Sequence, residues 1–103
     1  MYRNGLGVEQ DFKEAFKWFQ KAADQGDVNA QYFLGFAYFK GEGVLEDYVT
    51  GYAWWNIAAA NEIGSAKISK GEIAKTMTAE DISKAQELSK EMIKKNPKLL
   101  KKK

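Results

Sequence analysis

Apolar residues recur at helical spacing along most of this chain. Between about Asp11 and Gln25 they follow the i, i+3, i+4, i+7 rule of an amphipathic helix, at Phe12, Ala15, Phe16, Phe19, Ala22 and Ala23. The same reasoning predicts further helices over about 28–40, 48–60, 65–75 and 79–94. The pattern therefore predicts an all-α fold with about five helices.

Turn and capping residues lie between these apolar segments. The glycines of Gly5-Leu6-Gly7-Val8 predict a turn, after which Asp11 and Glu14 predict an N-cap and its capping-box partner. Gly26 predicts the end of the first helix. The remaining boundaries are predicted in the same way, by Gly41-Glu42-Gly43, Asp47, Thr78 and Pro97.

The chain repeats itself at a spacing of 36 residues, as Trp18 and Trp54 illustrate. Eight residues coincide at this shift: Tyr38, Gly41, Gly43, Val44, Asp47, Trp54, Ala58 and Ala59 fall on Tyr2, Gly5, Gly7, Val8, Asp11, Trp18, Ala22 and Ala23. A fixed period of this length is typical of helical repeats, in which each unit buries its apolar face against its neighbours. We therefore expect both tryptophans to fill gaps between helices.

The repeat divides the chain into four expected parts. These are a truncated first repeat with a turn and a second helix (1–26), a complete repeat (27–62), a degenerate repeat with a C-terminal capping helix (63–95) and a basic disordered tail (96–103). The last predicted helix has a polar outer face, as a terminal cap requires. By analogy with residues 29–37, the first unit lacks its first helix. We therefore expect either a fragment of a longer array or an exposed face that finds a partner.

The composition limits which catalytic and metal-binding sites the chain could form. The chain contains no His and no Cys, so the commonest general base, the commonest metal ligand and the thiol nucleophile are all absent. We expect no enzymatic activity, no cofactor and no metal site. Since Cys is absent and the first ten residues contain no apolar leader segment, we expect a cytoplasmic location for the chain as given.

The net charge of +2 is unevenly distributed, because residues 94–103 hold six Lys and no acidic residue. A basic tail can bind nucleic acid or an anionic membrane. Here the lysines have no Arg or interleaved aromatic residue among them. We therefore interpret the tail as a solvated segment and expect neither nucleic acid nor a membrane as the partner. Binding to an anionic surface through the tail remains an alternative.

The repeat positions carry a specific pattern: Ala30, Leu34, Gly35, Tyr38, Gly41, Gly43, Val44, Asp47, Trp54, Ala58 and Ala59. It is followed by a second one, Met77-Thr78…Asp81-Ile82…Ala85-Gln86…Leu88. Together they resemble the Sel-one-like repeat, a relative of the tetratricopeptide repeat, with the closing segment of its bacterial members. The resemblance implies an α-solenoid of antiparallel helix pairs with tetratricopeptide-like right-handed stacking. It also implies a non-catalytic scaffold or adaptor for protein–protein interaction.

The helix predicted over 28–40 is apolar on two sides. On a tetratricopeptide-like pattern, Leu34, Gly35 and Tyr38 lie against the partner helix. Five residues then point into the concave groove: Asn29, Tyr32, Phe36, Phe39 and Lys40. We expect these residues to bind a partner protein or peptide, because large rigid rings are typical of binding hot spots. The alternative is that the rings pack on the neighbouring unit as part of the core.

A second face could be open to a partner. Since the first helix of their unit is missing, Phe12, Phe16 and Phe19 are expected to be exposed on one side. The chain would then be a self-associating structural fragment of a longer repeat protein, forming a homo-oligomer through these rings. This alternative predicts a dimer in solution.

Overall fold

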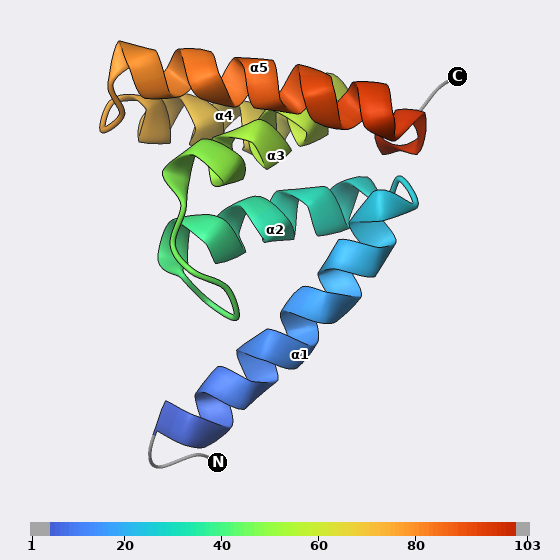
Figure 1. Cartoon of the computed structure of the whole chain (residues 1–103), viewed down its shortest axis with the longest axis vertical. Coiled ribbons are helices and arrows are strands. Elements are labelled where there is room, and N and C mark those ends of the chain that lie inside the picture. The colour runs from blue at the N-terminus through green and yellow to red at the C-terminus, as the bar shows by residue number, and fades with distance from the viewer. Residues whose placement is uncertain (1–4, 101–103) are drawn as a thin grey trace.

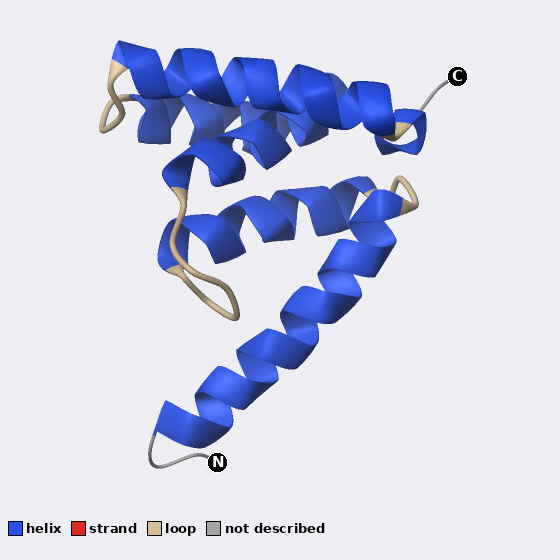
Figure 2. Ribbon diagram, viewed as in Figure 1, coloured by secondary structure: helices blue, strands red, loops and turns tan. Residues whose placement is uncertain are grey.

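The computed structural model describes the backbone of residues 5–100 and the side chains of residues 11–100. This part of the chain forms five α-helices and one 3-10 turn (Figure 1). They are α1 (Gly5–Asp24), α2 (Val28–Lys40), α3 (Tyr48–Ala60), α4 (Gly64–Ala74), α5 (Ala79–Lys95) and η1 (Pro97–Leu99). The described residues contain no strand (Figure 2), so the predicted all-α fold is confirmed.

Helix α3 lies at the centre of the stack. It contacts α2 on one side and α4 and α5 on the other. Helix α1 joins α2 through a tight turn, and the two helices diverge from that turn toward the beginning of α1 (Figure 1). The arrangement is a short α-solenoid with overall dimensions of 42 × 31 × 23 Å.

Side-chain caps begin three of the helices. The Asp47 carboxylate accepts a hydrogen bond from the Thr50 backbone amide (3.1 Å), and the Thr78 hydroxyl accepts one from the Asp81 amide (3.0 Å). Both caps were predicted, and both satisfy backbone donors that the first turn of a helix leaves free. Asp27 caps α2 in the same way (3.0 Å to the Ala30 amide) and was not predicted.

The beginning of the chain differs from the prediction. Residues Gly5-Leu6-Gly7-Val8 are part of α1, so the predicted turn is wrong and Asp11 is not an N-cap. The equivalent Gly41-Glu42-Gly43 segment connects two helices, and its glycines adopt φ angles of 70° and 81°. In α1, helical hydrogen bonding continues through Gly5 and Gly7, although each glycine costs about 1 kcal/mol relative to Ala.

Three hydrophobic clusters meet on α3. The first core lies between α1, α2, α3 and η1 and contains Ala23, Ala30, Leu34, Trp54, Ile57 and Leu99. The second core lies between α2, α3 and α5 and contains Phe39, Tyr52, Trp55 and Ala85. Small residues, Ala58, Ala59 and Ala66, form the contact between α3 and α4. Because α3 contributes to all three clusters, it holds the stack together.

The two repeated tryptophans have different environments. Trp54 is 4% exposed within the first core, as predicted, whereas Trp18 is 67% exposed. The prediction that Trp18 fills a gap is therefore wrong. Trp54 is buried because α2 places Ala30 and Leu34 in the same cluster. No described helix covers the corresponding side of α1.

The segment after α5 is ordered up to Leu100, against the prediction of a disordered tail over 96–103. Leu99 is 2% exposed in the first core. Its carbonyl oxygen accepts hydrogen bonds from the side-chain amides of Gln31 (2.9 Å) and Asn61 (2.8 Å). Asn96 donates to the Asp24 carbonyl oxygen (3.0 Å). These contacts tie the segment to α1, to α2 and to the residue that caps the end of α3, and they offset its loss of conformational entropy. Residues 101–103 lie outside the described part.

The outer face of α5 is polar, as predicted for a terminal cap. Its exposed residues include Glu80, Lys84, Glu87, Lys90 and Glu91. Lys84 lies 4.0 Å from Glu80, and Lys90 lies 3.8 Å from Glu87. Such exposed pairs contribute little stability. Their consequence is instead that the outer face of α5 presents mainly charged side chains to solvent.

Candidate functional site

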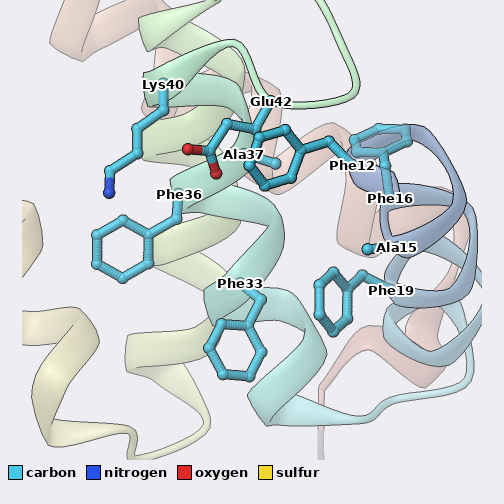
Figure 3. A pocket seen from close by; sticks show the side chains of 9 residues that line it. All are labelled: Phe12, Ala15, Phe16, Phe19, Phe33, Phe36, Ala37, Lys40 and Glu42. Atoms are coloured by element: carbon cyan, nitrogen blue, oxygen red, sulfur yellow. The ribbon is translucent and has the colours of Figure 1, made fainter. Parts of the chain in front are cut away.

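An open groove lies where α1 and α2 diverge. It encloses a cavity of about 280 Å³. Its lining, drawn in Figure 3, is Phe12, Ala15, Phe16 and Phe19 from α1, Phe33, Phe36, Ala37 and Lys40 from α2, and Glu42 from the following loop. We call this surface the aromatic groove.

Helical spacing explains why each helix presents one continuous wall. On α1 the lining residues recur at 12, 15, 16 and 19, and on α2 they recur at 33, 36, 37 and 40. Residues three and four positions apart share one helix face. The two series therefore place five phenylalanine rings along the two sides of one cavity, with small alanines between them.

Ring contacts join α1 and α2 beside the groove. Phe19 stacks on Phe33 with ring centroids 5.1 Å apart. Phe16 meets Tyr38 edge to face at 5.6 Å. Such geometries are favourable for aromatic pairs. Phe33 nevertheless keeps 46% of its surface exposed, so the groove presents apolar surface that the described residues leave uncovered.

Opposite charges lie at the rim of the aromatic groove. Lys40 places its ammonium nitrogen 5.5 Å from the Phe36 ring centroid, a cation–π distance. Glu42 lines the same cavity from the loop after α2. Since the rest of the lining is apolar, affinity would come from the rings, and these two charges could orient a bound chain.

Three of the five predicted site residues lie on the open side of α2. Asn29 and Lys40 are exposed, and Phe36 is half-buried. Phe36 and Lys40 line the aromatic groove, whereas Asn29 does not. By helical spacing, Asn29 shares their face at the first turn of α2.

Tyr32 and Phe39 do not line the aromatic groove, and Phe39 packs in the core, as the alternative to the binding prediction expects. Phe39 is buried in the second core, 4.5 Å from the Trp55 ring. Tyr32 stacks on Trp55 at 5.6 Å, and its hydroxyl lies 3.0 Å from Ser69 Oγ. The physical reason is Gly35, whose missing side chain lets Trp55 approach α2. There Trp55 Nε1 donates a hydrogen bond to the Tyr32 carbonyl oxygen (2.8 Å).

Sequence reasoning missed Phe33 as a groove residue. The signal was available, because residues 29, 33, 36 and 40 follow one another at steps of four, three and four, which is a single helix face. Phe12, Phe16 and Phe19 were singled out as an exposed face for self-association. They form the opposite wall of the same groove.

The described side chains contain no group of three or more His, Cys, Asp or Glu residues that could hold a metal ion. No helix in the described part of the chain is both long and apolar enough to cross a bilayer.

Burial raises the pKa of Tyr38, and the Asp47 carboxylate raises it further. Burial also raises the pKa of Tyr52, while a hydrogen bond with Gln86 lowers it. Both tyrosine rings pack in hydrophobic clusters between helices.

Stacked antiparallel helices with an open apolar groove define a helical repeat protein. The family model of the Sel1 repeat matches residues 1–27 and 28–62. The chain therefore belongs to the Sel1 repeat family. Repeats of this family generally mediate protein–protein interaction, and the fold is that of a scaffold.

Two known proteins are similar to this chain. The crystal structure of c5321, a protective antigen present in uropathogenic Escherichia coli strains, displays an SLR fold and matches with a TM-score of 0.76 and 36% identity, covering 92% of this chain and 21% of that one. The chitin synthase regulator SKT5 of Saccharomyces cerevisiae is 39% identical over 54 residues, which is 52% of this chain and 8% of SKT5. The chain thus spans a small part of each relative.

Proposed function

We propose that this chain binds a partner protein in the aromatic groove. The observation that carries the proposal is the arrangement of five phenylalanine rings around one open cavity, with Phe33 still 46% exposed. Exposed apolar surface of this kind marks interaction sites on soluble domains. Membership of a family of interaction scaffolds supports the same reading.

Specific residues have specific roles in the proposal. Phe19, Phe33 and Phe36 are the anchors, because removing the exposed surface of all three rings from water would contribute a few kcal/mol in total, at about 25 cal/mol per Å². Lys40 and Glu42 orient the partner at the rim. Asn29 supplies a polar contact at the other end of the same face of α2.

A photo-crosslinking experiment tests the groove. The residue p-benzoylphenylalanine is placed at position 33 or, as a control, at the exposed position 68 on α4, and lysate of the source cells is irradiated with each variant. We expect a discrete adduct from position 33 alone, lost when Phe36→Ser is added. Equal adducts from positions 33 and 68, or an adduct indifferent to Phe36→Ser, would contradict the proposal.

Self-association is the second candidate function. It is favoured by Phe12, Phe16 and Phe19, which line the open cavity and could accept a second copy. Light scattering over a wide concentration range separates the two candidates. A dimer that Phe19→Ser dissociates would support self-association, whereas a monomer at all concentrations leaves the groove to a foreign partner.

A further inference from the structure

The loop between α2 and α3 touches α1 beside the aromatic groove. This loop, residues 41–47, reaches from the end of α2 toward α1 (Figure 2). A Cβ on Gly43 would overlap the Phe12 carbonyl group, 2.7 Å from its carbon, and would lie 3.1 Å from the Lys13 backbone nitrogen. Gly43 therefore packs directly on the backbone of α1, and a residue without a side chain permits this approach.

The contact of Gly43 with Phe12 lies between two open cavities. Phe12 and Glu42 line the aromatic groove (Figure 3). The next residue of each segment, Lys13 and Gly43, lines a second cavity of about 320 Å³. Since the space on both sides is open, the backbones of Gly43 and Phe12 set the separation between the loop and α1 at this point.

Hydrogen bonds fix the loop to α2 on both sides of Gly43. The Glu42 amide donates to the Ala37 carbonyl oxygen (3.0 Å), and the Asp47 amide donates to the Tyr38 carbonyl oxygen (2.9 Å). Asp47 also caps α3. A side chain added at position 43 would therefore meet α1 from a loop that is anchored to two helices, so we expect α1 to be the part that moves.

Helix α1 is anchored near its other end. Asn96 donates a hydrogen bond to the Asp24 carbonyl oxygen (3.0 Å), and Phe19 stacks on Phe33. Phe12 precedes Asp24 by 12 positions, which is about 18 Å of helix. A displacement at Phe12 would therefore turn α1 about its anchored end and change the distance between the two walls of the aromatic groove.

We propose that Gly43 positions the α1 wall of the aromatic groove and so sets the width of the binding site. The inference rests on the proposed function, because it concerns the same groove, and Gly43 acts through α1 rather than through contact with a partner. Gly41 provides a comparison within the loop. Its φ is 70°, against 81° for Gly43, but a Cβ there would lie 3.5 Å from the nearest atom, an ordinary contact. The two glycines therefore share a backbone conformation and differ in their contact with α1.

Residual dipolar couplings of the backbone amides test the position of α1 in the full chain. The variant is Gly43→Asn and the matched control is Gly41→Asn, because Asn tolerates a positive φ better than most residues with a side chain. Carbon atoms in contact lie about 3.5 Å apart, so a Cβ at position 43 requires a shift of about 1 Å at Phe12, which is a rotation of α1 by roughly 3° over about 18 Å. We expect the couplings of α2 and α3 to fit the parent structure in both variants, and those of α1 to depart from it in Gly43→Asn alone.

Two outcomes of this measurement would overturn the proposal. One is that the couplings of α1 fit the parent structure equally well in both variants, which would show that the loop moves instead of the helix. The other is an equal departure in Gly41→Asn, which would show that any side chain in the loop has the same effect. The pair Gly43→Ala and Gly41→Ala repeats the comparison with the smallest side chain, so the test does not depend on the folding of one variant.

Photo-crosslinking connects the position of α1 with binding. In the chain that carries p-benzoylphenylalanine at position 33, we expect Gly43→Asn to reduce the yield of the partner adduct about tenfold, as the loss of central contacts does. Gly41→Asn, on the other side of Glu42, should leave the yield unchanged. An adduct that persists although α1 has turned would overturn the proposal, while binding in the groove would stand. If the parent chain forms no adduct, the proposed function fails, and the couplings still decide whether Gly43 positions α1.

Discussion

Gly35 and Gly71 occupy the same position in successive units, yet their surroundings differ. A side chain at Gly35 would overlap the Trp55 ring, whereas a Cβ at Gly71 would meet nothing within 4 Å. We predict that Gly35→Ala lowers the free energy of unfolding by about 1–3 kcal/mol through overpacking. The matched change Gly71→Ala should raise it by up to about 1 kcal/mol, because Ala favours a helix.

Urea denaturation followed by circular dichroism measures both glycine variants. The two changes add the same methyl group to a helix, so their difference isolates the contact with Trp55. A Gly35→Ala variant as stable as the parent chain would show that α2 and α3 do not cross as closely as described.

The raised pKa of Tyr38 predicts a loss of stability at alkaline pH. Burial and the Asp47 carboxylate raise its pKa above 10.0 in the folded chain, so folding favours the neutral phenol. The resulting stabilisation is complete below the unfolded pKa and is lost as pH rises through the folded pKa. We expect Tyr38→Phe to lose less stability than the parent between about pH 8 and about pH 11. Urea midpoints at the two pH values measure this, and equal losses would contradict it.

Single residues were predicted well where their role is local. Asp47 and Thr78 cap helices because their own side chains reach the backbone three residues later. Phe39 was placed wrongly because its direction depends on the close approach of Trp55 at Gly35. That approach is a property of two helices together, and the periodicity of one helix does not contain it.

At the scale of elements, η1 carries a clear prediction. Leu99 is 2% exposed in the first core, so Leu99→Ala should cost about 2–4 kcal/mol of unfolding free energy. The control is Leu45→Ala, since Leu45 is exposed in the loop before α3 and its loss should change stability by less than about 0.5 kcal/mol. Chemical denaturation gives both values. Equal stabilities of the two variants would mean that η1 is not packed in solution.

The same segment shows why element boundaries were harder to predict than element types. Periodicity identified every helix, but the composition of residues 96–103 indicated disorder. What orders residues 96–100 is a set of contacts to Asp24, Gln31 and Asn61, all far away in the sequence. The predicted turn at residues 5–8 failed in the opposite sense, because α1 continues through both glycines despite the local turn signal.

For the whole molecule, the structure predicts uneven protection of the backbone. Helix α3 has eight buried residues, whereas α4 buries only Ala66, and Ile63 gives α4 no side-chain cap. We therefore expect backbone amides of α4 to exchange with solvent faster than those of α3. Hydrogen–deuterium exchange with mass spectrometry measures this. Equal protection of α3 and α4 would mean that the stack opens as one cooperative unit.

The architecture of the whole stack was predictable because it repeats. Eight residues that coincide at a shift of 36 predicted a stack of repeated helix pairs. The groove was only partly predictable: Phe36 and Lys40 were predicted on the binding face of α2, whereas Phe33 was not. The packing angle between α1 and α2 decides which rings remain uncovered, and that angle is a tertiary property.

The charged outer face of α5 makes the two ends of the molecule chemically different. Glu80, Lys84, Glu87 and Lys90 close one end of the stack, while Trp18 remains exposed at the other. The molecule is therefore asymmetric in the way that a surfactant is: its uncovered apolar surface lies at one end and its hydrated charges lie at the other.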